Sequence, residues 1–193
     1  MYDIVHSMDT KPKTLYHGSG IKITDGFIRA KPGHINGMKT EVVAVFAKSD
    51  YTEAMVYAIM RKVGYWWRSP RRGNELYVDS LNPDISGKGY IYELDSDGFV
   101  SDAVTNKNDY YCLTDKPIIK ETEFDIMDKI KNGEIKVYIL KDKIDFSKMS
   151  KQDSTILWRK LVNQKDNFEL YKPDVKNIDM AILTKAKDMV FNK

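Results

Sequence analysis

The feature that most constrains the fold is a continuous apolar run at residues 42–47, which a helical pattern follows closely. A run this short and this apolar is typical of a strand buried on both faces, at the centre of a sheet. After a polar turn, Asp50 and Glu53 have capping-box spacing, and apolar residues then recur at helical intervals up to Gly64. The sequence therefore predicts a buried strand, a tight turn and an amphipathic helix that form one rigid unit.

The remaining pattern indicates a β-rich body followed by a helical part. Residues 31–37 hold two Gly and one Pro, which is typical of a loop. Further strands are expected at residues 14–16, 89–94, 110–113, 117–124 and 134–140, and a short helix at residues 126–132. Helical periodicity returns at residues 154–162 and 174–190. We therefore expect an α+β domain over residues 1–140 and a helical C-terminal extension over residues 141–193, packed on that domain.

Composition excludes several classes of protein. The 193 residues are 42% hydrophobic, which is enough for one sizeable core. The net charge is only +3, whereas a typical DNA-binding domain is more basic and concentrates its positive charge on one face. No run reaches the roughly 20 apolar residues of a membrane span. Three His and one Cys are scattered without ligand spacing, so we expect no metal site. The single cysteine, Cys112, allows no internal disulfide and fits a cytoplasmic protein.

A histidine lies at the end of the first expected strand. Residues 15–19 read Leu-Tyr-His-Gly-Ser, which places the His17 imidazole where the strand stops. Gly18 has no Cβ, so a ligand could come close to the backbone beside it. A lone strand-end histidine is more often a structural residue with satisfied hydrogen bonds, and the sequence leaves both interpretations open. His34, in the expected loop, is treated as an ordinary loop histidine.

Two further features of the sequence could take part in catalysis or binding. Glu121 and Glu123 are two residues apart in an expected strand, so their carboxylates should share one face of the sheet. Trp66 and Trp67 lie among five cationic residues, Arg61, Lys62, Arg68, Arg71 and Arg72. Such a segment can stack on bases and hold phosphates. The alternative is that the Trp pair covers the core while the arginines stay solvated.

The chain resembles the diphtheria-toxin-like ADP-ribosyltransferases, the group that includes poly(ADP-ribose) polymerases. The run from Tyr16 to Ser19 is similar to the family's first motif. The Val45-Phe46-Ala47 strand end, followed by a polar turn and a helix with Tyr57, is similar to the second motif. Glu123 or Glu121 is similar to the glutamate of the third. Two departures are Val45, where the family has tyrosine, and a one-residue shift of the helix tyrosine.

The resemblance implies a twisted, split β-sheet core and NAD as co-substrate. It implies that His17 holds the adenosine ribose and that the Gly18 backbone pairs with the nicotinamide carboxamide. Tyr51 or Tyr57 would then cover the nicotinamide ring, with further contacts from Ser19 and Ser49. Glu123, or Glu121, would stabilise the oxocarbenium-like sugar that forms when the nicotinamide–ribose bond breaks.

The expected function is transfer of ADP-ribose from NAD to a macromolecular acceptor, either a protein or a nucleic acid, without a membrane or a metal. Three alternatives remain open. The first is NAD hydrolysis, with water as the acceptor. The second is a catalytically inactive nucleotide-binding or interaction module. The third is a nucleic-acid-binding protein that uses the Trp66–Trp67 segment, for which binding should depend steeply on salt.

Overall fold

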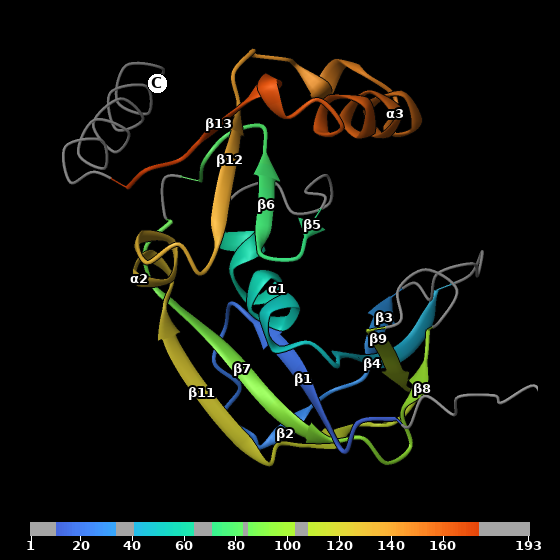
Figure 1. Ribbon diagram of the computed structural model, residues 1–193. Helices are drawn as coiled ribbons and strands as arrows, with labels where there is room; N and C mark the ends of the chain where they lie inside the picture. Colours follow the sequence, from blue (N-terminus) through green and yellow to red (C-terminus); the bar gives the residue numbers. More distant parts are fainter. Residues whose placement is uncertain (1–10, 34–40, 64–70, 83–84, 103–107, 174–193) are drawn as a thin grey trace, which may run out of the picture. The chain divides into compact units, whose positions relative to one another are not determined.

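The computed structural model describes residues 11–33, 41–63, 71–82, 85–102 and 108–173 (Figure 1). The protein is α+β, and its strands are mostly antiparallel, which confirms the predicted class at this level. Contacts divide the chain into two units. Unit 1 comprises Met1–His17, Ile23–Tyr51 and Tyr92–Glu121, and unit 2 comprises Gly18–Lys22, Thr52–Ile91 and Thr122–Lys193. The boundary expected between residues 140 and 141 does not separate these units, because Thr122–Lys193 all belong to unit 2.

Unit 1 is built on a seven-stranded sheet in which β11, β7, β1, β4, β9 and β8 are successive neighbours and β3 also pairs with β4. Three of its strands continue into unit 2. A separate two-stranded ladder joins β2 and β10. The bounds are β1 (Thr14–Ser19), β2 (Phe27–Ile28), β3 (Lys31–Gly33), β4 (Val42–Lys48), β7 (Lys88–Asp95), β8 (Val100–Ser101), β9 (Asp109–Cys112), β10 (Lys116–Pro117) and β11 (Lys120–Asp125).

Strand β4 confirms the expected central strand. It pairs with β1 through Tyr16 and Lys48 and with β9 through Val45 and Cys112. Ala44, Val45 and Ala47 are buried, whereas Val43, opposite Pro32 of β3, is 57% exposed. Burial on both faces therefore holds for the middle and end of β4 and not for its beginning.

Two expected segments differ from the structure. The loop expected at residues 31–37 begins with a strand, β3, because its backbone pairs with β4; the rest, including His34, lies outside the described residues. The strand expected at residues 117–124 is two strands, β10 and β11. The break occurs because Ile118 N–H donates to the carbonyl of Gly26, just before β2 (2.9 Å), whereas Ile119 N–H donates to the carbonyl of Glu93 in β7 (2.9 Å), so successive residues bond to different segments.

Helix α1 (Tyr51–Val63) confirms the predicted helix, and its part from Thr52 onward belongs to unit 2. Its apolar residues are removed from solvent as the helical spacing predicted: Ala54, Ala58 and Ile59 have no exposed area, and Met55 has 4%. Helix α2 (Ile126–Lys131) is also confirmed. The Asp125 side chain caps its first turn by accepting from Asp128 N–H.

A second sheet lies wholly in unit 2, with the order β13, β12, β6, β5. Its strands are β5 (Arg71–Arg72), β6 (Glu75–Val78), β12 (Lys136–Leu140) and β13 (Phe168–Leu170). The pairing of β6 with β12 is parallel, whereas β13 runs antiparallel to β12. Only β12 was expected from the sequence, because β6 and β13 are short and lack a clear alternation.

Helix α3 (Lys151–Val162) packs in the same unit as this sheet and confirms the first helix of the C-terminal part. It begins three residues before the expected start because Ser150 caps it, accepting from Asp153 N–H. Two 3-10 turns flank it, η2 (Phe146–Lys148) and η3 (Lys165–Asn167). Its buried side joins an aromatic-rich core cluster of Tyr77, Leu140, Phe146, Trp158, Val162 and Phe168. The helix expected at residues 174–190 lies outside the described residues.

Candidate functional site

His17 is held in one tautomer by the neighbouring strand of unit 1. Its Nδ1 lies 2.7 Å from the carbonyl oxygen of Phe46 in β4. A carbonyl only accepts hydrogen bonds, so Nδ1 carries the proton and Nε2 of the neutral ring is an acceptor. Burial lowers the pKa of His17 below its usual 6.5, outweighing the Phe46 bond, and the charge of Lys31 acts in the same direction as burial. The ring is therefore neutral at physiological pH.

An aromatic pair and an ion pair lie near one another in unit 1. The rings of Tyr16 and Tyr51 meet edge to face, with centroids 5.3 Å apart and planes at 83°. Lys120 Nζ lies 2.8 Å from Glu93 Oε1. Glu93 raises the pKa of Lys120, and the nearby Tyr51 and Tyr16 hydroxyls act in the same direction. The cluster therefore combines two aromatic rings, a cation and a carboxylate that is 24% exposed.

Glu93 is a further member of the site that was not among the residues predicted from the sequence. The available signal was its position in the alternating strand at residues 89–94. Alternation puts it on the same face as Ile91, which is fully buried, rather than on a solvated face. A carboxylate at such a position needs a partner, and Lys120 supplies one.

Alternation along β1 also separates two of the predicted binding residues. Tyr16 and His17 are successive in the strand, so their side chains leave opposite faces of the sheet. Tyr51 packs on Tyr16 and therefore lies on the face opposite His17. The structure does not bring the His17 imidazole and the Tyr51 ring to one face.

The two predicted serines make local structural hydrogen bonds. In unit 1, Ser49 Oγ donates to Asn108 Oδ1 (3.1 Å) and Ser49 N–H donates to the Asn108 carbonyl (3.0 Å). In unit 2, Ser19 Oγ donates to the carbonyl of Ile21 (2.7 Å) and accepts from its N–H (3.1 Å). Both hydroxyl protons are engaged, so each oxygen could meet a ligand only as an acceptor.

Gly18 is needed for the packing of α1 in unit 2. A Cβ at this position would lie 1.8 Å from the carbonyl oxygen of Ala54 and 2.9 Å from the nitrogen of Ala58. The helix backbone thus occupies the space beside Gly18 in which a ligand was expected. Tyr57 lies in this helix and is partly buried.

Glu121 and Glu123 are both exposed in β11, while Phe124 between Glu123 and Asp125 is buried. This alternation agrees with a shared face for the two carboxylates. In unit 2, Lys88 Nζ lies 3.6 Å from Glu123 Oε1, and the two side chains are 50% and 44% exposed. An ion pair this exposed contributes little to stability, so separating Glu123 from Lys88 to bind another group would cost little free energy.

The other predictions concern metals, membranes and the Trp segment. Among the described residues, no group of three or more His, Cys, Asp or Glu side chains is arranged to hold a metal ion. In the same part of the chain, no helix is long and apolar enough to cross a membrane. Trp66 and Trp67 lie outside the described residues.

No family of known proteins matches the sequence, and neither a curated protein nor a solved structure resembles the chain measurably.

Proposed function

We propose that the protein binds NAD through His17 and cleaves its nicotinamide–ribose bond as an ADP-ribosyltransferase. The observation that supports this most is the hydrogen bond from His17 Nδ1 to the Phe46 carbonyl. It leaves Nε2 as a fixed, neutral acceptor, and a ribose hydroxyl is a donor of matching polarity. Burial keeps the ring neutral, so the acceptor persists at physiological pH.

In this proposal a carboxylate supplies the electrostatic contribution to catalysis. Breaking the bond between the ribose C1′ and the nicotinamide nitrogen leaves positive charge on the sugar, and nicotinamide departs with the bonding electrons. Glu123 stabilises this charge more in the transition state than in the ground state, with Glu121 as the alternative residue. A nucleophile on a protein or nucleic-acid acceptor then forms the new bond at C1′ and loses its proton.

A second candidate function is nucleotide binding without turnover. Two observations favour it: Glu123 faces Lys88 at 3.6 Å, and Val45 stands where a stacking tyrosine is expected. In that case His17 would still hold the ribose, while the carboxylate would serve only the surface ion pair. Product analysis separates the two functions, because only the transferase releases nicotinamide.

Binding is tested by thermal unfolding in the presence of NAD, with two variants of His17. Bound ligand stabilises by about 2.7 kcal/mol at a hundredfold excess over Kd, so the unaltered protein should melt at a higher temperature. In His17→Asn the amide nitrogen can take the place of Nδ1 and still donate to Phe46, but nothing replaces Nε2. This variant should melt like the unaltered protein without NAD and lose the shift with NAD.

His17→Ala serves as the comparison, because it removes both ring nitrogens. If His17 is only structural, the asparagine variant should recover the stability that the alanine variant loses and keep the full NAD shift. That pattern, or the absence of any NAD shift in the unaltered protein, would contradict the proposal.

A further inference from the structure

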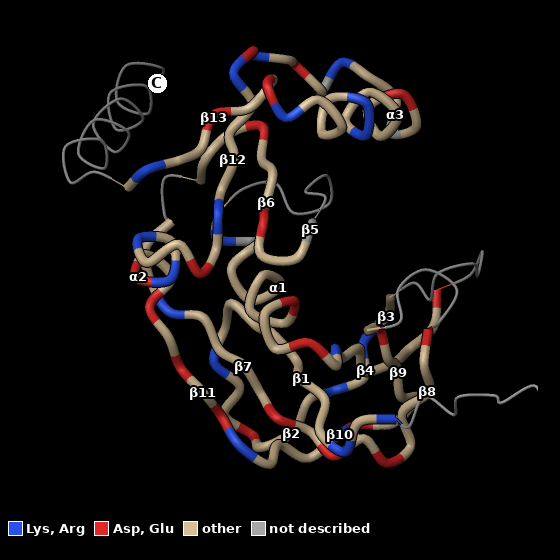
Figure 2. The backbone as a smooth tube through the Cα atoms, viewed as in Figure 1, with Lys and Arg blue, Asp and Glu red and all other residues tan. Residues whose placement is uncertain are grey.

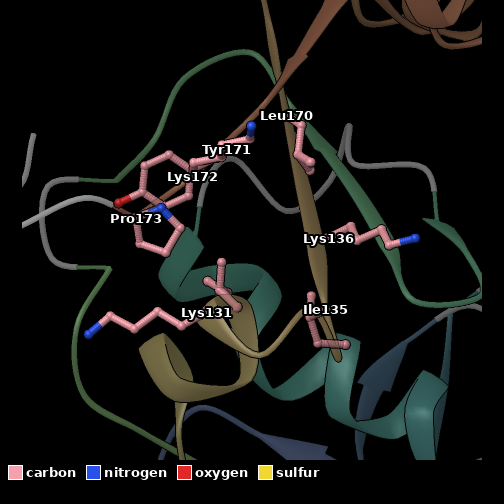
Figure 3. Close-up of a pocket in the computed structure, with 9 residues that line it drawn as sticks. Lys131, Ile135, Lys136, Leu170, Tyr171, Lys172 and Pro173 are labelled. Atoms are coloured by element: carbon pink, nitrogen blue, oxygen red, sulfur yellow. The ribbon is translucent and has the colours of Figure 1, made fainter.

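Unit 2 contains a pocket that shares no lining residue with the proposed NAD site. It has a volume of about 330 Å³ and lies between the end of α2, the start of β12 and the chain that follows β13 (Figure 3). Its floor is apolar, since Ile130 is 5% exposed and Ile135 is fully buried. Tyr171 adds a partly buried wall, fixed by its N–H bond to the Val137 carbonyl (2.8 Å).

The rim of the pocket is cationic. Lys131, Lys136 and Lys172 line it, and none of the described residues that line it carries a carboxylate. Lys136 lies opposite Glu75 in the ladder of β6 and β12, and its charge helps to lower the pKa of Glu75. The acidic neighbour Glu134 is already paired with Lys129, at 2.7 Å. Figure 2 marks the cationic positions of α2, the start of β12 and the chain after β13 in blue.

The directions of the lysines indicate the kind of ligand. In Figure 3 the ammonium ends of Lys131 and Lys136 extend in opposite directions, away from the pocket, while their stems line it. One small anion could not meet both. An extended chain with an apolar side chain in the pocket and acidic residues on either side could meet each lysine separately.

We propose that this pocket binds an acidic peptide segment of a partner protein, with one large apolar side chain as its anchor. A pocket of about 330 Å³ accommodates a leucine-sized or phenylalanine-sized group, which would cover its apolar floor. The three lysines pair with carboxylates on both sides of that anchor. The lining residues that the structure describes include no acidic side chain, which suits this polarity and disfavours a basic peptide.

The test measures binding of a short fluorescent peptide, in which a central leucine is flanked by glutamates, to the full chain by fluorescence anisotropy. Binding should saturate and weaken with added salt, because exposed ion pairs are screened. Combining Lys131→Glu, Lys136→Glu and Lys172→Glu should weaken it by about tenfold or more at low salt.

A matched control changes net charge equally at exposed positions outside the pocket, with Lys143→Glu, Arg159→Glu and Lys160→Glu. This control should bind the peptide within about twofold of the unaltered protein, because long-range charge effects are weak at moderate salt. Replacing the peptide leucine by serine should also weaken binding by about tenfold.

Three outcomes would overturn the proposal. The first is the absence of saturable binding to the unaltered protein. The second is equal weakening by both charge-reversed variants, which would show non-specific attraction. The third is binding to phosphatidylserine vesicles without binding to the peptide, which would assign the lysines to a membrane surface. Circular dichroism of each variant verifies that the fold is retained.

Discussion

Replacing Gly18 by alanine should destabilise the protein strongly, because the added Cβ would collide with the backbone of α1. It would lie 1.8 Å from the Ala54 carbonyl oxygen, whereas ordinary contacts begin near 3.4 Å. Relief requires the strand and helix to separate by about 1.6 Å, the difference between these distances. The obstructing atoms are backbone atoms and cannot turn aside as a flexible side chain could.

The expected cost is at the upper end of overpacking effects, about 3 kcal/mol. In a chain of this length that corresponds to a fall in Tm of about 6–12 °C, measured by circular dichroism. Gly133→Ala is the matched control, because Gly133 has φ of 73° but a Cβ added there would have no atom within 4 Å. That variant should cost only about 1 kcal/mol, from backbone strain. A Gly18→Ala protein that melts no lower than Gly133→Ala would refute the packing argument.

Two further predictions concern pH. Glu75 accepts from Tyr77 Oη (2.7 Å) and Lys165 Nζ (2.8 Å), and although burial alone would raise its pKa, these bonds lower it below 4.5. The contribution of Glu75 to stability is therefore present above pH 4.5 and is lost as the pH falls below that value. Glu75→Gln should lower the free energy of unfolding by about 1 kcal/mol at pH 7 and by less at pH 4, as measured by urea unfolding. An equal loss at both pH values would contradict this prediction. The pKa of His17 is lowered from 6.5, so NAD affinity, measured by titration calorimetry, should stay constant from neutral pH down to about 6.5. It should fall only in more acidic solution. A loss of affinity that begins above pH 6.5 would count against His17 as the binding residue.

Local patterns in the sequence predict the elements that depend on near neighbours. The apolar run of β4 and the helical spacing of apolar residues in α1 were enough to place both elements, because the pattern of buried residues in each is visible within its own segment. The short helix predicted at residues 126–132 likewise corresponds to α2. The α+β class follows from these elements.

Features that depend on distant residues could not be predicted in the same way. The parallel pairing of β6 with β12 joins Glu75 to Lys136, and nothing in either segment indicates the other. The same holds for the candidate site. The tautomer of His17 depends on a carbonyl at Phe46, and the crowding at Gly18 depends on Ala54. Main-chain groups that act on a distant side chain leave no trace in residue identity.

The carboxylate in the proposed reaction is tested by comparing Glu123→Gln with Glu121→Gln. Glutamine keeps the shape and most of the hydrogen bonding but removes the negative charge that the developing oxocarbenium needs. Glu123→Gln should slow nicotinamide release by roughly 10²–10³-fold and leave NAD affinity nearly unchanged. Glu121→Gln should instead shift the balance between transfer and hydrolysis. An unaltered rate for Glu123→Gln would show that this residue is not the catalytic one.

The most direct measurement of the central claim is incubation of the full chain with NAD labelled in both the nicotinamide and the adenosine parts. Free nicotinamide, free ADP-ribose and labelled macromolecule are then separated, with candidate protein and nucleic-acid acceptors present. We predict nicotinamide release that is lost in His17→Asn, together with adenosine label attached to an acceptor. Intact NAD after incubation with every acceptor, in a protein that NAD does not stabilise against heat, would contradict the claim.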